Sequence, residues 1–140
     1  MGRLLGIDPG TRRIGVALSD PSGSIASPYS TIEARDEDAD VQAIAAVAAE
    51  NDVEEIVVGY PKKMDGTPGP AAEAASSLAD RLRDRTGIAV TLWDERLSSV
   101  QADRAMLGQG EKRRTRREAT DRVAAAIVLQ SYLDAKRSRS

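Results

Sequence analysis

The chain has 140 residues, a formal net charge of −2, and neither cysteine nor histidine. This length is typical of one domain. The absent residue types exclude disulfides, thiolate chemistry and imidazole ligands, so metal or acid–base chemistry must use carboxylates, which suit Mg²⁺ or Mn²⁺ better than Zn²⁺. No apolar run reaches the ~18 residues of a membrane helix. The N-terminus does not resemble a signal peptide, so the sequence predicts a cytoplasmic protein without a membrane partner.

The predicted elements begin with three strands. The first strand covers residues 3–7, ends at Asp8, and is followed by turn residues. The second, at 14–18, alternates apolar and small residues, and the two are expected to be antiparallel neighbours. A third strand is expected at about 25–32. Asp40 is the expected N-cap of the helix that follows.

Strands and helices alternate in the rest of the chain. The β-branched run at 55–60 predicts a buried central strand, and the proline-rich stretch 61–70 predicts a loop. A further strand is expected at 88–93, and helices at 70–85, from Ser98 to before Gly108, and at about 114–136.

This order predicts an α/β fold with a mixed five-stranded sheet flanked by helices, in which the first strand is central. Residues 1–136 are expected to form a single domain, and residues 137–140 a disordered basic tail.

Three carboxylates occupy positions that favour a metal site. Asp8 ends the first strand, and Glu95 follows the strand that ends at Trp93. Ligands of open α/β sheets lie beyond the carboxyl ends of the strands, so these two acids converge if their strands are parallel neighbours. Asp121 is predicted on the apolar face of the last helix, with Ala124, Ala125, Val128 and Tyr132. A charge there is costly unless cations compensate it.

Each of these acids also has a purely structural interpretation. Asp8 precedes Pro9 and could be a turn residue, whereas Glu95 could belong to a solvated charged loop. Asp121 could lie near a helix N-terminus, where the dipole favours an acid. Three such positions in a chain without His or Cys nevertheless favour a metal site.

Basic residues are concentrated towards the C-terminus. Residues 111–140 hold nine Lys or Arg against four Asp or Glu, whereas residues 1–110 hold eleven against eighteen. These basic residues could form a tail that only aids solubility, or they could bind a polyanionic ligand. The predicted phosphate-binding residues are Lys112, Arg113, Arg114, Arg116 and Arg117, extended by Arg12, Arg13, Lys62 and Lys63. With one Trp, three Tyr and no Phe, base stacking is not expected to dominate.

Four segments in order resemble the motifs of the bacterial YqgF/RuvX family. Residues 6–17 read GIDPGTRRIGVA, residues 58–67 contain VGYP and MDGT, residues 94–99 read DERLSS, and residues 121–130 join Asp121 to AAAIVLQ. The resemblance covers about residues 4–133. It implies an RNase H-like fold and a nuclease that hydrolyses phosphodiester bonds, with Asp8, Glu95 and Asp121 as the catalytic, metal-binding acids and Mg²⁺ or Mn²⁺ as cofactor.

Members of this family are known as pre-16S rRNA nucleases and were formerly described as Holliday junction resolvases. The resemblance therefore implies 5′-end maturation of pre-16S rRNA, with RNA favoured over DNA, ribosomal precursor particles as partners, and a monomer or weak dimer. Alternatives are a resolvase acting on branched DNA, a non-catalytic nucleic-acid-binding module, and an actin-like ATPase, which needs two such domains. RNA against DNA, endonuclease against exonuclease action, and one metal against two stay open.

Overall fold

The computed structural model describes residues 2–10, 12–60, 69–94 and 113–138, and for residues 113–122 it describes the backbone alone. Five strands form a sheet in the order β3-β2-β1-β4-β5. They are β1 (Arg3–Asp8), β2 (Arg13–Ser19), β3 (Ala26–Glu33), β4 (Val53–Tyr60) and β5 (Ala89–Asp94). β1 pairs antiparallel with β2 and parallel with β4, and β4 pairs parallel with β5. The predicted mixed five-stranded sheet with the first strand at its centre is confirmed.

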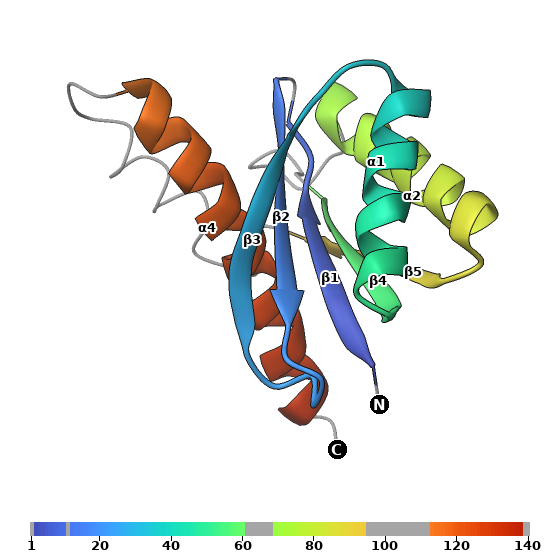
Figure 1. Cartoon of the computed structure of the whole chain (residues 1–140), viewed down its shortest axis with the longest axis vertical. Coiled ribbons are helices and arrows are strands. Elements are labelled where there is room, and N and C mark those ends of the chain that lie inside the picture. Colours follow the sequence, from blue (N-terminus) through green and yellow to red (C-terminus); the bar gives the residue numbers. More distant parts are fainter. Residues whose placement is uncertain (1, 11, 61–68, 95–112, 139–140) are drawn as a thin grey trace.

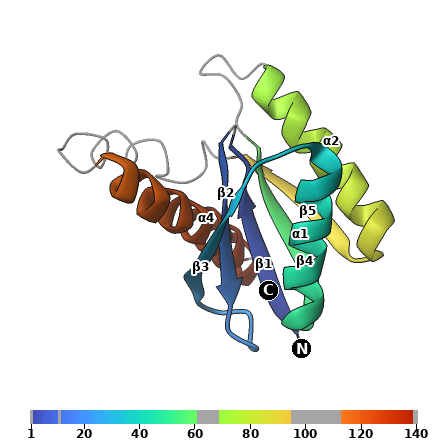
Figure 2. The same ribbon diagram turned by 45° about the horizontal axis from the view of Figure 1, so that its top comes forward.

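Helices cover both faces of this sheet (Figures 1 and 2). α1 (Glu37–Glu50) and α2 (Pro70–Thr86) lie on one face, and α4 (Arg113–Ser138) lies on the other. Successive side chains of a strand point to opposite faces. Leu5 and Ile7 of β1 therefore pack in the core on the α1–α2 face, whereas Leu4 packs in the core on the α4 face. None of the described helices is long and apolar enough to cross a membrane.

Polar side chains fasten α4 across the sheet. On one side the Gln130 side chain accepts a hydrogen bond from the Ala26 amide (2.8 Å) and donates one to the Ser24 carbonyl (3.0 Å). On the other side the Tyr132 hydroxyl donates to the Glu55 carboxylate of β4. α4 crosses this face obliquely in roughly the opposite direction to β1, and its first turns project beyond β3 on the side towards which β1 runs (Figure 1).

β3 is an edge strand with a bulge. Val16 of β2 lies opposite Ser30, but Ala17 lies opposite Pro28, so Tyr29 is the extra residue. A bulge beside a proline discourages pairing with another chain, because it interrupts the row of backbone hydrogen-bonding groups.

The predicted start of α1 is wrong. The helix begins at Glu37, because Asp36 is the N-cap and its side chain accepts a hydrogen bond from the Ala39 amide (2.8 Å). Asp40, the predicted cap, lies inside the helix, and its carboxylate accepts from the Arg35 amide (2.9 Å). Several acids compete for the capping position here, and the sequence pattern did not distinguish them.

The first two residues of the predicted tail belong to α4. α4 continues through Arg137 and Ser138, and Arg137 forms an ion pair with Asp134 (2.5 Å). This pair joins residues one helical turn apart, so it favours continuation of the helix. The helix predicted from Ser98 lies outside the described residues.

The two ends of the described chain lie close together at one end of the sheet (Figures 1 and 2). β1 begins there and α4 ends there. The opposite end of the sheet, where β1, β4 and β5 finish, is therefore remote from both ends of the chain.

Candidate active site

The carboxyl ends of three parallel strands form one edge of the sheet. β1 ends at Asp8, β4 at Tyr60 and β5 at Asp94. Tyr60 lies opposite Asp94, and Ile7, the residue before Asp8, lies opposite Val58. The expected parallel arrangement of these strands is thus confirmed, and it brings Asp8 and Asp94 to the same edge on either side of β4. Glu95, the residue after Asp94, lies outside the described residues.

Asp8 is held at this edge by its backbone. It pairs with Gly15 of β2, and the chain then turns through Pro9 and Gly10. A Cβ atom at Gly10 would lie 2.5 Å from the carbonyl oxygen of Arg13, so this turn has room only for glycine. The tight turn therefore follows directly from the sequence after Asp8, and it presents Asp8 at the end of the central strand.

Burial distinguishes Asp8 from most polar residues in the described part of the chain, where only Asp8 and Ser19 are buried. Ser19 has an evident structural role, since its hydroxyl accepts from the Leu4 amide (2.8 Å) and donates to the Asp20 carbonyl (2.9 Å). Asp8 is an ionisable group that is only 2% exposed, at the edge where open α/β sheets bind ligands. Its position is that of a functional acid.

The face of α4 that contacts β1 leads towards Asp121. A Cβ atom at Gly6 would lie 2.8 Å from the Leu129 Cβ and 3.1 Å from the Ala125 carbonyl oxygen, so helix and strand nearly touch there. Two residues along a strand advance ~6.6 Å, and four residues along a helix advance ~6 Å. Asp121 therefore lies about one helical turn from Ala125, in the general direction in which β1 runs from Gly6 to Asp8. The side chain of Asp121 is not among those described.

The predicted metal site is therefore described in part. Among the described side chains, no three acids are grouped so as to hold a metal ion. Of the three predicted acids, this description includes the side chain of Asp8 alone. The clustering of Asp8 with Glu95 and Asp121 stays a prediction.

The predicted phosphate-binding residues are also described in part. Arg12 is exposed, and Arg13 at the start of β2 is half-buried. For Arg113, Arg114, Arg116 and Arg117 the backbone lies at the start of α4, whereas Lys62, Lys63 and Lys112 lie outside the described residues.

Arg35, which the sequence did not single out, lies at the same end of the sheet. The Ala34 amide donates to the Arg12 carbonyl (2.8 Å), so the connection from β3 to α1 lies against the β1–β2 turn. Arg35 is exposed. Its neighbourhood depends on a contact between segments far apart in the sequence, and local periodicity carries no signal of such a contact.

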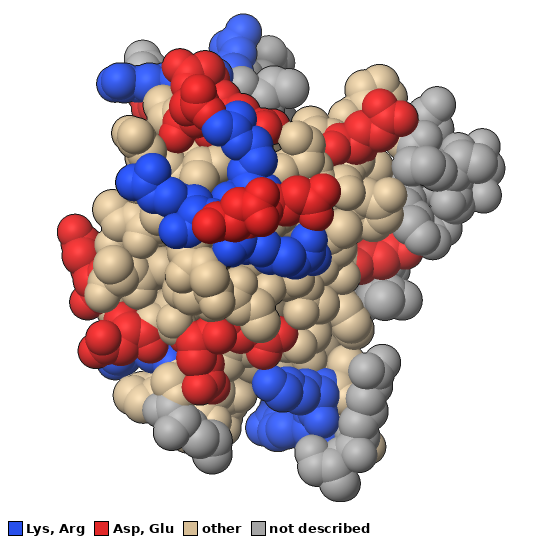
Figure 3. Space-filling model, turned by 90° about the vertical axis from the view of Figure 1, so that its right-hand side faces the viewer, with Lys and Arg blue, Asp and Glu red and all other residues tan. Residues whose placement is uncertain are grey.

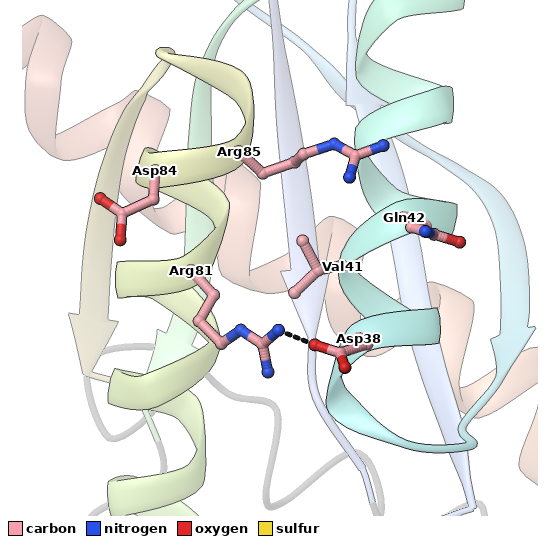
Figure 4. Close-up of a pocket in the computed structure, with 6 residues that line it drawn as sticks. All are labelled: Asp38, Val41, Gln42, Arg81, Asp84 and Arg85. Carbon is pink, nitrogen blue, oxygen red and sulfur yellow. Dashed lines mark ion pairs between the residues drawn. The ribbon is translucent and has the colours of Figure 1, made fainter.

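The side of the molecule that carries α2 has charges of both signs interspersed (Figure 3). Arg81 of α2 forms ion pairs with Glu37 and Asp38 of α1. A pocket of about 430 Å³ lies between these two helices. In Figure 4 Arg81 points towards Asp38, whereas Asp84 points away from both. This side of the molecule therefore carries charges that are paired with one another.

The fold, a mixed five-stranded sheet with helices on both faces, places the protein in the RNase H-like fold class. The structure of T. thermophilus RuvC in complex with a Holliday junction substrate aligns with 100% of this chain and 98% of that chain, at a TM-score of 0.64 and 12% identity. Within this class the chain belongs to the RuvX family, since a family model described as "RuvX: Holliday junction resolvase" matches residues 2–135.

Relatives agree with this assignment. A protein of Myxococcus xanthus (strain DK1622) named "Putative pre-16S rRNA nuclease" is 47% identical over 135 residues, which cover 96% of this chain and 89% of that protein. One of the same name from Geobacillus kaustophilus (strain HTA426) is 45% identical over 137 residues, covering 96% and 99%. The family, the fold and the nuclease class predicted from the sequence are confirmed.

Proposed function

We propose that this nuclease hydrolyses phosphodiester bonds of RNA in the 5′-end maturation of pre-16S rRNA, with divalent cations held by Asp8, Glu95 and Asp121. The observation that carries the proposal is the buried carboxyl group of Asp8 at the end of the central strand. The names of the relatives supply the substrate class.

The alternation of the strands supports this set of acids. Leu4 packs in the core on the α4 face and Gly6 lies against α4, and a period of two continues that face to Asp8. Trp93 of β5 also packs on the α4 face, and Glu95 follows it by two residues in the sequence. Asp121 lies one helical turn before Ala125, a buried residue of α4, and helical periodicity predicts both on the same face.

The donor set fits Mg²⁺ or Mn²⁺. The chain has no histidine or cysteine, and the described member of the set is a buried carboxyl group. Magnesium prefers oxygen ligands and takes few carboxylates, because it keeps several of its waters. When bound, such cations neutralise charge that develops on the phosphate and make a water molecule more acidic.

The residues of the chain have distinct roles in this reaction. Asp8 is fixed by strand pairing and would hold the cations together with Glu95 and Asp121. The basic residues at the start of α4 hold phosphates on the substrate backbone. Hydrolysis forms a bond from a water oxygen to phosphorus and breaks the bond to the leaving oxygen. In a chain without histidine, the proton of that water passes to solvent, to the substrate phosphate or to a carboxylate.

The site of action that suits this substrate is the cytoplasm, where precursor ribosomal particles are the expected partners of a monomer or weak dimer. Few aromatic residues are available for stacking, so recognition relies on the backbone and shape of the RNA.

The second candidate function is resolution of branched DNA, which the description of the family model favours. The deciding experiment compares cleavage of a structured RNA that spans the 5′ end of precursor 16S rRNA with cleavage of a four-way DNA junction, both with Mn²⁺. Faster cleavage of the RNA is expected. The reverse ranking would favour the resolvase, and cleavage of neither would favour a non-catalytic binding module.

A further inference from the structure

Two connections meet at the end of the sheet where β1 finishes. The β1–β2 turn carries Arg12, and the connection from β3 to α1 carries Arg35. A backbone hydrogen bond from Ala34 to Arg12 (2.8 Å) joins them, and Arg13 pairs with Glu33 in the strands just below. Figure 2 shows the connection passing over this end of the sheet. Arg12 and Arg35 are therefore neighbours on the surface.

The backbone on either side of Arg35 is fixed. The Arg35 amide donates to the Asp40 carboxylate (2.9 Å), and Asp36, the next residue, caps α1. The Arg35 side chain thus projects from a rigid segment. Little backbone entropy would be lost when it contacts a ligand.

The two arginines are uncompensated. Within the described residues neither Arg12 nor Arg35 has an ion pair, and both are exposed. Elsewhere on the described surface Arg81, Arg83 and Arg137 are each paired with an acid. An unpaired guanidinium keeps its full capacity to bind an anion, since no carboxylate neutralises it.

The acids near this patch are mostly engaged with other groups. Asp36 and Asp40 accept from backbone amides, and Glu37 accepts from Ser77 and Arg81 of α2. Glu33 is exposed beside Arg13, and both Glu33 and Asp40 line a pocket together with Arg35. A hydrogen bond from an amide does not neutralise a carboxylate, so these acids keep their charge, but within the described residues none of them forms an ion pair with Arg12 or Arg35.

We propose that Arg12 and Arg35 form a second phosphate-binding patch, which contacts the nucleic-acid backbone on the α1 side of Asp8. The proposal rests on the proposed nuclease function, because it takes the polyanion to be the substrate. α4, with the arginines of its first turns, lies on the opposite face of the sheet. The substrate strand then crosses the carboxyl edge of the sheet between two basic surfaces, with Asp8 between them.

The test measures binding of a fluorescent RNA hairpin with single-stranded extensions at both ends, in EDTA so that no cleavage occurs. Each phosphate contact contributes about 0.7–0.9 to the slope of log affinity against log salt. The double variant Arg12→Ala/Arg35→Ala should therefore lower the slope by about 1.4–1.8. Arg12→Lys/Arg35→Lys keeps the charges and should retain it. The matched control is Arg85→Ala, an exposed arginine on α2 beside the pocket of Figure 4, which should leave the slope unchanged.

The outcomes separate this proposal from the proposed function. If the wild type cleaves the RNA with Mn²⁺ but the alanine double variant keeps the full slope, the patch is refuted and the nuclease function stands. If the slope falls in that variant but the wild type cleaves nothing, the patch is supported and the nuclease function fails. Equal losses in the alanine and lysine variants would refute a role for charge at these positions.

Discussion

Asp8 is buried and lies at the proposed metal site, so it could serve the structure, the metal site or both. An isosteric substitution separates the structural role from the metal-binding role. Asp8→Asn keeps the shape of the side chain and removes its charge. Cleavage should fall by orders of magnitude, because cation stabilisation of the transition state is worth several kcal/mol. The melting temperature of the metal-free protein should stay or rise, since crowded carboxylates repel one another. The measurements are the cleavage rate, and the melting temperature against Mn²⁺ concentration.

In the wild type Mn²⁺ should raise the melting temperature, because a ligand that binds only the folded state stabilises it. Asp8→Asn should abolish this rise. Asp84→Asn, an exposed change on α2, is the matched control and should preserve both the rise and the cleavage rate. An Asp8→Asn protein that cleaves normally would place the site elsewhere, and one that fails to fold would make Asp8 a structural turn residue.

The groups that are hydrogen-bonded to the Glu55 carboxylate should make the folded protein less stable at alkaline pH. Burial and the hydrogen bond to Glu55 raise the pKa of Tyr132, and the hydrogen bond to Glu55 raises the pKa of Lys136. Groups with raised pKa values hold their protons more tightly in the folded state. Their stabilisation is therefore complete below about pH 10 and is lost as the pH rises through the folded pKa values.

The melting temperature should consequently fall above about pH 10, and Tyr132→Phe should make that fall less steep. Thermal unfolding followed by circular dichroism across this range tests it. Tyr29→Phe, at an exposed tyrosine of β3, serves as the control. An identical alkaline profile for wild type and Tyr132→Phe would show that this cluster does not set the limit.

At the scale of elements, the approach of α4 to β1 depends on Gly6. The methyl group of Gly6→Ala would lie too close to the Leu129 Cβ and to the Ala125 carbonyl oxygen, so α4 must move. We expect a destabilisation of about 1–3 kcal/mol. Cleavage should fall further than stability explains, because α4 carries Asp121. Trp93 stacks edge-to-face on Tyr132 of α4 (5.3 Å), so its fluorescence should report the displacement.

Gly2→Ala is the control, because it adds a methyl group near the other end of β1, where it meets Asp52 and Glu54. It should lower stability without the additional loss of cleavage. Both variants are assayed at a temperature at which they are folded. Wild-type cleavage by folded Gly6→Ala would mean that the position of α4 does not matter to the site.

Most elements could be predicted because their signals are local. A short apolar run marked β1, period-two alternation marked β2, and the β-branched run marked β4, since these patterns reflect which side chains are buried. The start of α1 could not be predicted, because Asp36 and Asp40 both suit a cap. The bulge at Tyr29 was also missed, since it arises from how β3 pairs with β2.

The candidate site was predictable to the extent that it depends on strand ends and helix faces. The position of Asp8, the parallel strand that precedes Glu95, and the buried stripe of α4 that leads to Asp121 all follow from periodicity. Arg35 was missed because its place beside Arg12 results from tertiary packing of distant segments. Local patterns predict which face a residue occupies, but they do not predict which connections meet at an edge.

At the scale of the whole molecule, the uneven charge predicts how the enzyme holds its substrate. Arg113, Arg114, Arg116 and Arg117 belong to a segment with net positive charge in a chain that is negative overall. Changing all four to Ala should weaken RNA binding and flatten its salt dependence, with little effect on sequence preference. The measurement is affinity against salt concentration for two RNAs of equal length and different sequence. If the slope of affinity against salt concentration did not change, these arginines would not contact the RNA, and their role would be to keep the protein soluble.

The antiparallel arrangement of β1 and α4, with both chain ends at the same end of the sheet, has a mechanical consequence. A pulling force applied through the two ends would draw the start of β1 and the end of α4 apart across the face of the sheet. It would load the contacts between them one after another, as in opening a zipper, and not all together, as in shear. The packing between Leu4 and the C-terminal part of α4 would yield first, and the carboxyl edge that carries Asp8 would bear the load last.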